Sequence, residues 1–173
     1  PDYLREGLAV VSVGLNPSAP SVEAGFYFGN PRNRFWPAIN RSRLVTEPLE
    51  PGPQAVATLF ERYGIGFTDV VKRATRGGSE LRAADFREWA PRLRDKLLHW
   101  QPRVAWFHGK QAYTRYLRHA EGERPEGVDW GAQRRRIGGS SVFVTPNPSP
   151  ANAAFSLDDL VAWYDRLAAV LER

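Results

Sequence analysis

Residues 9–20 read AVVSVGLNPSAP and join two features that bear on both the fold and the site. The apolar first half has the length and composition of a buried strand, and it stops at Gly14. A polar turn follows, in which Pro17 fixes its own φ and restricts Asn16 to extended conformations. The pattern returns in SVFVTPNPSPAN, residues 141–152. We therefore predict two strands that each end in an Asn-Pro-Ser loop, with both loops facing one place.

Helical patterns lie between the apolar runs. Ser156 is a favourable N-cap for the last of them, with Asp159 three residues further on, whereas Pro91 predicts a kink or a fresh helix start. The predicted strands cover residues 8–13, 104–107 and 141–144, and the predicted helices cover residues 54–63, 84–100, 110–118 and 157–171. Strands separated by helices predict an α/β domain with a largely parallel sheet and helices on both faces. We find no linker or repeat, so residues 1–173 are expected to form a single domain.

The composition limits the classes of function. The chain has 173 residues, 42% of them hydrophobic, which suits a globular rather than a disordered protein. It has no cysteine, and this excludes disulfides, thiolate nucleophiles and cysteine-held zinc or iron–sulfur clusters within the chain. The formal net charge is +5, which is compatible with nucleic-acid binding, although an arginine-rich genome would give the same balance.

The same composition sets expectations about the compartment. No apolar run approaches the length of a membrane span, so we expect no membrane association and a cytoplasmic location. The chain contains no methionine, so Pro1 is not a translation start and we expect an N-terminal piece to precede it.

Residues 25–40, GFYFGNPRNRFWPAIN, place aromatic side chains beside two arginines, Arg32 and Arg34. Flat rings next to guanidinium groups can stack on bases and bind phosphates. The alternative is a loop that folds its aromatic residues into the core, which we expect at least for Phe35 and Trp36. Ligands of parallel α/β sheets collect at the carboxyl ends of the strands, where both Asn-Pro-Ser loops are expected.

Residues 63–75, YGIGFTDVVKRAT, are interpreted as a glycine-rich turn that leads to Asp69. Asp69 could cap a helix, which is the commonest role for aspartate after a turn, or it could be an acid placed in a cleft. His108 follows a predicted strand and is assigned a structural role. The three histidines show no metal-ligand spacing, and no Ser-His-Asp arrangement is discernible.

Five motifs in order resemble one family: GLNPS, GFYFGNPRNRFW, YGIGFTDVVKRAT, QPRVAWFHGKQAY and NPSPAN before a final helix. The chain is similar, over roughly residues 8–171, to the mismatch-specific uracil-DNA glycosylases and their thymine-DNA glycosylase relatives. The resemblance implies a three-layer α/β/α sandwich, the uracil-DNA glycosylase fold, that needs no metal or cofactor. We also expect the protein to be a monomer. It implies a glycosylase that initiates base excision repair on double-stranded DNA with G·U or related mispairs, by flipping out and excising uracil. Thymine and ethenocytosine are further substrates in the family.

Matching positions assign roles by this resemblance. Asn16 matches the asparagine that orients the attacking water, and Phe28 matches the aromatic residue that stacks on the flipped base. Leu15 and Ser18 complete the base pocket with Phe28. The loop that enters the DNA stack corresponds to Asn147, Pro148, Ser149, Pro150, Ala151 and Asn152. We expect Arg32, Arg34, Lys72 and Arg73 to contact the DNA backbone.

The sequence departs from the family at three places. Ser18 stands where glycine is usual, and the wedge has Ala151 and Ala153 where relatives have a bulkier residue and an arginine. Asp69 replaces an asparagine or a lysine, and a carboxylate near Asn16 could activate the water or stabilise the sugar cation. The preference between uracil and thymine, and the need for an opposite guanine, stay open.

Two other interpretations fit parts of the same sequence. A non-catalytic nucleic-acid-binding domain would use the arginines and aromatic residues without needing Asn16 in a fixed place. An α/β hydrolase or transferase that acts on a free nucleoside would cleave deoxyuridine and depend little on salt, whereas binding through several phosphates weakens steeply with salt.

Overall fold

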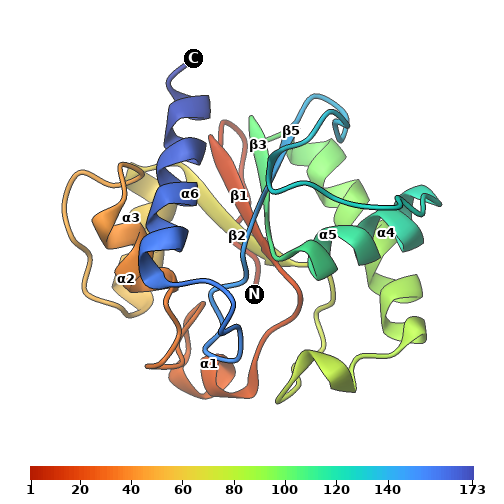
Figure 1. Cartoon of the computed structure of the whole chain (residues 1–173), viewed down its shortest axis with the longest axis horizontal. Coiled ribbons are helices and arrows are strands. Elements are labelled where there is room, and N and C mark those ends of the chain that lie inside the picture. The colour runs from red at the N-terminus through yellow and green to blue at the C-terminus, as the bar shows by residue number, and fades with distance from the viewer.

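A computed structural model describes residues 1–173 and shows a five-stranded sheet with helices on both faces (Figure 1). The strand order is β2-β1-β3-β5-β4, and every pair is parallel except the antiparallel pair of β4 and β5. The strands are β1 (Val10–Gly14), β2 (Ile65–Asp69), β3 (Val104–His108), β4 (Gly131–Ala132) and β5 (Ser141–Thr145). This confirms the predicted α/β/α sandwich with a mostly parallel central sheet.

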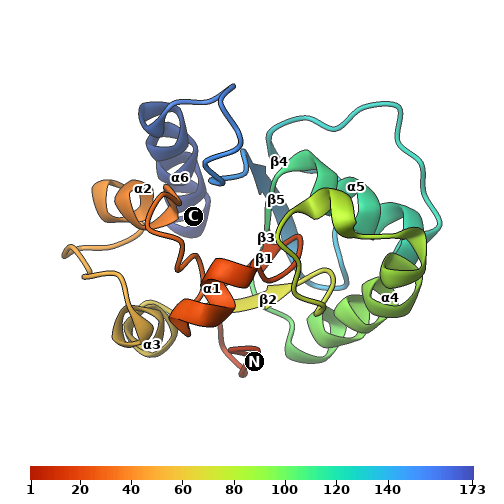
Figure 2. The same ribbon diagram turned by 90° about the horizontal axis from the view of Figure 1, so that it is seen from below.

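The helices form two layers. Helices α2, α3 and α6 cover one face of the sheet and α4 and α5 cover the other, while α1 lies near the carboxyl ends of the strands (Figures 1 and 2). The α-helices are α1 (Ala19–Ala24), α2 (Phe35–Arg41), α3 (Pro53–Arg62), α4 (Ala83–Trp100), α5 (Lys110–Tyr116) and α6 (Leu157–Leu171). A 3₁₀ turn, Gly78–Glu80, precedes α4, and a π-helical turn, Leu117–Glu121, extends α5.

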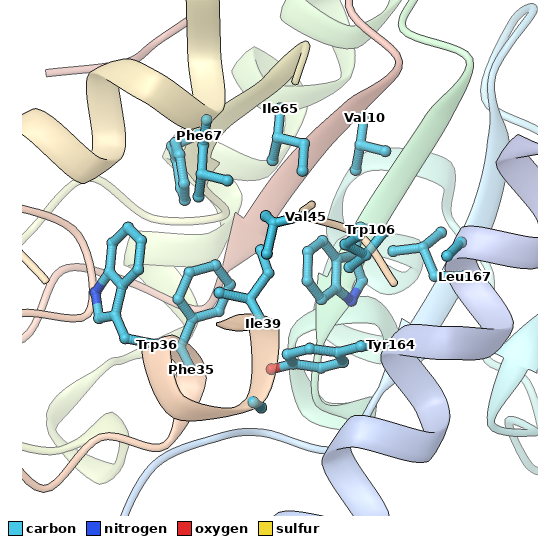
Figure 3. Packing of buried hydrophobic residues seen from close by; sticks show 14 of the residues in the cluster. Val10, Phe35, Trp36, Ile39, Val45, Ile65, Phe67, Trp106, Tyr164 and Leu167 are labelled. Carbon is cyan, nitrogen blue, oxygen red and sulfur yellow. The ribbon is translucent and has the colours of Figure 1, made fainter. Parts of the chain in front are cut away.

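Each central strand contributes to both cores because successive side chains point to opposite faces. Val10 and Trp106 pack under α2, α3 and α6, in the cluster drawn in Figure 3, whereas Val11 and Phe107 pack against α4 and α5. Phe35 in α2 is fully buried and contacts Trp106 and other rings of the first cluster. The expected burial of Phe35 and Trp36 is thus confirmed.

The prediction of a glycine-rich turn over residues 63–75 is wrong for the first half of that range. Ile65–Asp69 forms the strand β2, and every residue of it is buried. Gly66 explains the unusual strand sequence. The N-terminal residue Tyr3 bridges to Phe67 through two backbone hydrogen bonds of 2.9 and 3.0 Å, and a Cβ at Gly66 would lie only 2.3 Å from the carbonyl oxygen of Tyr3. Glycine therefore allows the N-terminal residues to pair with the edge of the sheet.

Two predicted helix details have different outcomes. Ser156 and Asp159 form the expected capping box at α6, with reciprocal hydrogen bonds of 3.1 and 2.8 Å. Pro91 does not begin a new helix, since it lies inside the continuous helix α4. None of the helices has the length and apolarity needed to cross a membrane.

Replacing Gly66 with alanine should displace Tyr3 from β2, because the added methyl group has no space beside the Tyr3 carbonyl. We expect a loss of about 1–3 kcal/mol in the free energy of unfolding, as for other overpacking substitutions. Urea unfolding would measure it. Gly127→Ala is the matched control, since a Cβ there meets no atom within 4 Å. Equal midpoints for the two variants would contradict the assigned role of Gly66.

Candidate active site

A cleft of about 990 Å³ opens at the carboxyl ends of the parallel strands. Residues that follow β1, β2, β3 and β5 all line it, together with the aromatic segment before α2. Both Asn-Pro-Ser loops are part of its wall, so the sequence correctly predicted that they face one place.

The loop after β1 is fixed by backbone hydrogen bonds that continue the β1–β2 pairing beyond the sheet. Residues 14–19 run beside residues 70–75, and a bridge joins Ser18 to Thr75. The N–H groups of Val70, Val71 and Thr75 donate to the carbonyl oxygens of Gly14, Leu15 and Pro17, and the N–H of Ala19 donates to Thr75, at 2.8–3.2 Å. The loop is thus held in one conformation, as the prolines in its sequence suggested.

Asn16 is held by its amide nitrogen, with its oxygen free. Nδ2 donates to the carbonyl oxygen of Arg73 at 2.9 Å and to Oγ1 of Thr75 at 2.7 Å. A carbonyl oxygen can only accept, so these contacts fix which end of the amide faces the protein. Oδ1 accepts no hydrogen bond within the protein and lies on a residue that lines the cleft.

Thr75 is a site residue that the sequence analysis missed. Its hydroxyl donates to the carbonyl oxygen of Gly77 at 2.9 Å and therefore offers its oxygen to Asn16 as an acceptor. Only the pairing of β1 with β2 brings these residues together, so recognising β2 in the sequence would have been the signal.

The second Asn-Pro-Ser loop is built differently. Asn147 Oδ1 accepts a hydrogen bond from the N–H of Ser149 at 2.9 Å, and the side chain of Asn152 donates to the Asn147 carbonyl oxygen at 3.0 Å. The Arg34 guanidinium donates to three carbonyl groups of this loop, those of Ser149, Asn152 and Phe155. Asn147 therefore stabilises its own loop, and its amide oxygen, unlike that of Asn16, already accepts a hydrogen bond within the protein. At the tip, Pro150 and Ala151 are exposed.

Phe28 lies between the core and the cleft. Its ring stacks on Phe35 with centroids 4.2 Å apart and an interplanar angle of 16°, and it meets His108 edge to face at 5.1 Å. The backbone of Phe28 has φ = 56°, in the left-handed region that bulky residues rarely adopt. Such strain persists only where the surrounding structure enforces it, and it is concentrated at functional sites.

Leu15 and Ser18 line the same cleft. Leu15 packs against the core on the α4 and α5 side. Ser18 is the N-cap of α1, and its hydroxyl accepts from the N–H of Ser21 at 3.2 Å and donates to the Ser21 hydroxyl at 2.9 Å. The backbone N–H groups of Asn16 and Ser18 make no hydrogen bond within the protein, so they can serve a ligand.

Asp69 is the last residue of β2 and lies opposite Gly14 in the register. No helix begins there, so the helix-cap alternative is wrong. Only 5% of Asp69 is exposed, and it lines the cleft. A Cβ at Gly14 would lie 2.7 Å from Oδ1 of Asp69, so glycine at position 14 makes room for this carboxyl group.

Lys72 lies at the centre of a charge network around Asp69. Its Nζ is 3.1 Å from Asp69 Oδ2, 2.9 Å from Asp2 Oδ1 and 3.2 Å from the Tyr27 hydroxyl. Asp2 also binds Lys96 at 2.6 Å. Burial raises the pKa of Asp69, and the nearby Lys72 ammonium opposes that rise. The buried carboxyl is therefore a stronger base than an exposed aspartate.

His108, which is assigned a structural role from the sequence, also lines the cleft. The ring is 2% exposed, with Nε2 2.7 Å from the Ser12 hydroxyl and Nδ1 buried without a partner. Burial lowers the pKa of His108 to about 3, so the imidazole is neutral at physiological pH. No group of three or more His, Asp or Glu side chains could hold a metal ion.

The four basic residues expected at the DNA backbone are not equally available. Arg34 binds the carbonyl groups of the Asn147 loop, Lys72 is enclosed by carboxylates, and Arg73 pairs with Asp85 at 2.9 Å. Only Arg32 has a side chain without an internal partner. The structure thus places three of these cations in internal contacts, while their contact with the DNA backbone stays a prediction.

Comparison with known proteins agrees with this architecture. The profile of the uracil DNA glycosylase superfamily matches residues 1–168. The solution NMR structure of a candidate uracil DNA glycosylase from Methanosarcina acetivorans superimposes with a TM-score of 0.61 and 23% identity, over 97% of this chain and 96% of that one. At this identity the likeness supports the fold, whereas the profile match covers almost the whole sequence. The chain belongs to the uracil DNA glycosylase superfamily.

Proposed function

We propose that the protein is a monofunctional DNA glycosylase of the mismatch-specific type, which excises uracil opposite guanine from double-stranded DNA. Superfamily membership implies a DNA glycosylase. The observation that carries the proposal is Asn16: its Nδ2 is anchored by Arg73 and Thr75, and its Oδ1 is left without a partner in the wall of a cleft large enough for a nucleotide.

The chemistry requires little acid–base strength from the protein. Breaking the N-glycosidic bond leaves an oxocarbenium-like sugar and a uracil anion, so the departing base must be stabilised and a water must be aimed at the sugar. Asn16 Oδ1 can hold that water by accepting a hydrogen bond. The free N–H groups of Asn16 and Ser18 are donors suited to the anion. Phe28, backed by Phe35, offers a ring on which the base can stack.

Asp69 adds a carboxylate to this arrangement. It lies at the strand end next to the Asn16 loop, where a negative charge would favour the sugar cation or activate the water. Lys72 favours the ionised form of Asp69, which burial alone would suppress. We propose that Asn16 positions the water and that the Asp69 carboxylate acts on the water or the cation.

The Asn147–Asn152 loop is proposed to enter the base stack. It is held by its own hydrogen bonds and by Arg34, so it can press on DNA without collapsing. Its tip carries the small residue Ala151, which fills less of the gap left by a flipped base than a bulky side chain would. Flipping costs least at a mispair. The mismatch itself is therefore proposed to supply much of the selectivity.

Single-turnover excision assays test the proposal on duplexes with U or T opposite G or A, on single-stranded U and on free deoxyuridine. We expect the highest rate for U opposite G and none for the nucleoside.

Asn16→Ala should lower the excision rate at least about 100-fold, because the water loses its acceptor. Thr75→Val should lower the rate about 10-fold through a loosened Asn16.

Thr58→Val is the matched control, because the Thr58 hydroxyl bonds only to Gln54 on an exposed part of α3. Duplex binding without excision of any base would identify a non-catalytic domain instead, and cleavage of deoxyuridine would identify a nucleoside enzyme.

The role of Asp69 predicts a pH dependence. Excision should fall as the pH drops through the raised pKa of Asp69, because protonation removes the carboxylate. Lys72→Met removes the cation that favours the ionised form, so the midpoint should move up by about one pH unit or more. Asp69→Asn should be slow at every pH and lack this acid limb. His108 is not its source, because its pKa is about 3.

Lys96→Met serves as the comparison, since Lys96 contacts Asp2 and not Asp69, and its midpoint should shift less than that of Lys72→Met. An unchanged midpoint in Lys72→Met, or an Asp69→Ala variant with full rate, would remove Asp69 from the mechanism.

A further inference from the structure

Three cationic side chains line the cleft: Lys72, which is paired with Asp2 and Asp69, and two others, Arg76 and Lys110. Neither side chain forms an ion pair or a hydrogen bond within the protein. Each is therefore available to an anionic ligand without the loss of an internal contact.

Arg76 lies beside the catalytic asparagine loop. It directly follows Thr75, which holds Asn16, and its backbone N–H is fixed by Glu80 Oε2 at 2.7 Å. The residue is exposed, so its guanidinium group extends from a fixed backbone at the rim of the cleft.

Lys110 lies beside the other loop. The preceding residue, Gly109, is so close to Asn147 that a Cβ would lie 3.3 Å from that side chain. The Lys110 ammonium lies 4.5 Å from the ring centroid of Trp130, and Trp130 meets Phe155 edge to face at 5.2 Å. All these residues line the cleft. The aromatic ring thus restrains a cation that has no carboxylate partner.

The topology places the two cations on opposite sides of Asn16. Arg76 follows β2 and Lys110 follows β3, and these strands pair with the two edges of β1, which leads to Asn16. A nucleotide whose sugar is presented to Asn16 would carry its two flanking phosphates toward these two sides.

We propose that Arg76 and Lys110 bind the backbone phosphates on either side of the extruded nucleotide, and that Trp130 is a positioning residue for Lys110. The inference rests on the proposed function and assigns its DNA contacts. Two cations at the rim would draw the DNA backbone toward the cleft and compensate for a wedge that has little bulk. These two residues would supply phosphate contacts while Arg34, Lys72 and Arg73 keep their internal partners.

The test is the salt dependence of binding to a G·U duplex, measured by fluorescence anisotropy in the Asn16→Ala background, in which base excision should be slow compared with the measurement. Each phosphate contact contributes about −0.9 to the slope of log affinity against log salt. Arg76→Met and Lys110→Met should each reduce the steepness of that slope by about 1, and the double variant by about 2. Affinity at low salt should fall by several-fold for each.

Arg166→Met is the matched control. The Arg166 guanidinium lies 4.4 Å from the Trp163 ring in α6. The substitution therefore removes one cation–π pair and one positive charge, as Lys110→Met does, but at a residue outside the cleft. Its slope should match that of the parent. Trp130→Leu should weaken binding when Lys110 is present and have no further effect in the Lys110→Met protein, which a purely structural role of the ring would not produce.

Unchanged slopes in both cation variants, with salt-dependent binding by the parent, would overturn the inference and leave the proposed function standing. A parent protein that does not bind duplex DNA would instead refute the proposed function. A reduced slope in Arg166→Met equal to that in Lys110→Met would show a general charge effect and also overturn the inference.

Discussion

The site depends on the backbone ladder that continues β1 and β2 beyond the end of the sheet. Parallel strands normally diverge into separate loops, but here residues 14–19 and 70–75 stay paired by hydrogen bonds. The pairing brings the Arg73 carbonyl and the Thr75 hydroxyl to the Asn16 amide. It also sets Asp69 against Gly14, within the same wall of the cleft. This backbone pairing therefore positions both candidate catalytic side chains, the neutral Asn16 and the acidic Asp69. A shift of residues 14–19 would also displace residues 70–75.

Charge is divided between two uses around this ladder. The internal group, centred on Lys72 with Asp2 and Asp69, is shielded and holds the N-terminal residues to β2 while it sets the ionisation of Asp69. Arg34 similarly uses its donors on the Asn147 loop. Such buried charges are costly unless fully paired, so they cannot be released to a ligand. Arg76 and Lys110, in contrast, line the cleft without an internal ion pair and are available to an anionic ligand. The number of cations available to bind phosphate is therefore smaller than the net positive charge of the chain suggests.

Much of the fold could be predicted from sequence, because three strands are short continuous apolar runs and the long helices have clear apolar periods. The strand β2 could not, since Gly66 and Thr68 interrupt its apolar pattern, and both are explained by the crossing of Tyr3 and a hydrogen bond to Asp2. Asn16 and Phe28 were identified through motifs, and their cleft location follows from the topology. The partners of Arg34 and the support of Asn16 by Thr75 arise from contacts between residues more than 50 positions apart, which a local pattern does not report.

The left-handed backbone at Phe28 sets two requirements against each other: low backbone strain and an aromatic side chain at this position. Glycine or asparagine would adopt that conformation with less strain, and a selection for thermal stability alone could reward the backbone relief. Neither residue has a ring that could stack on Phe35, as Phe28 does, or on the base that we propose it contacts. Homologues adapted to heat would then be expected to keep an aromatic residue here and to gain stability elsewhere. Position 28 is thus a place where a stabilised design could lose its activity while its fold improves.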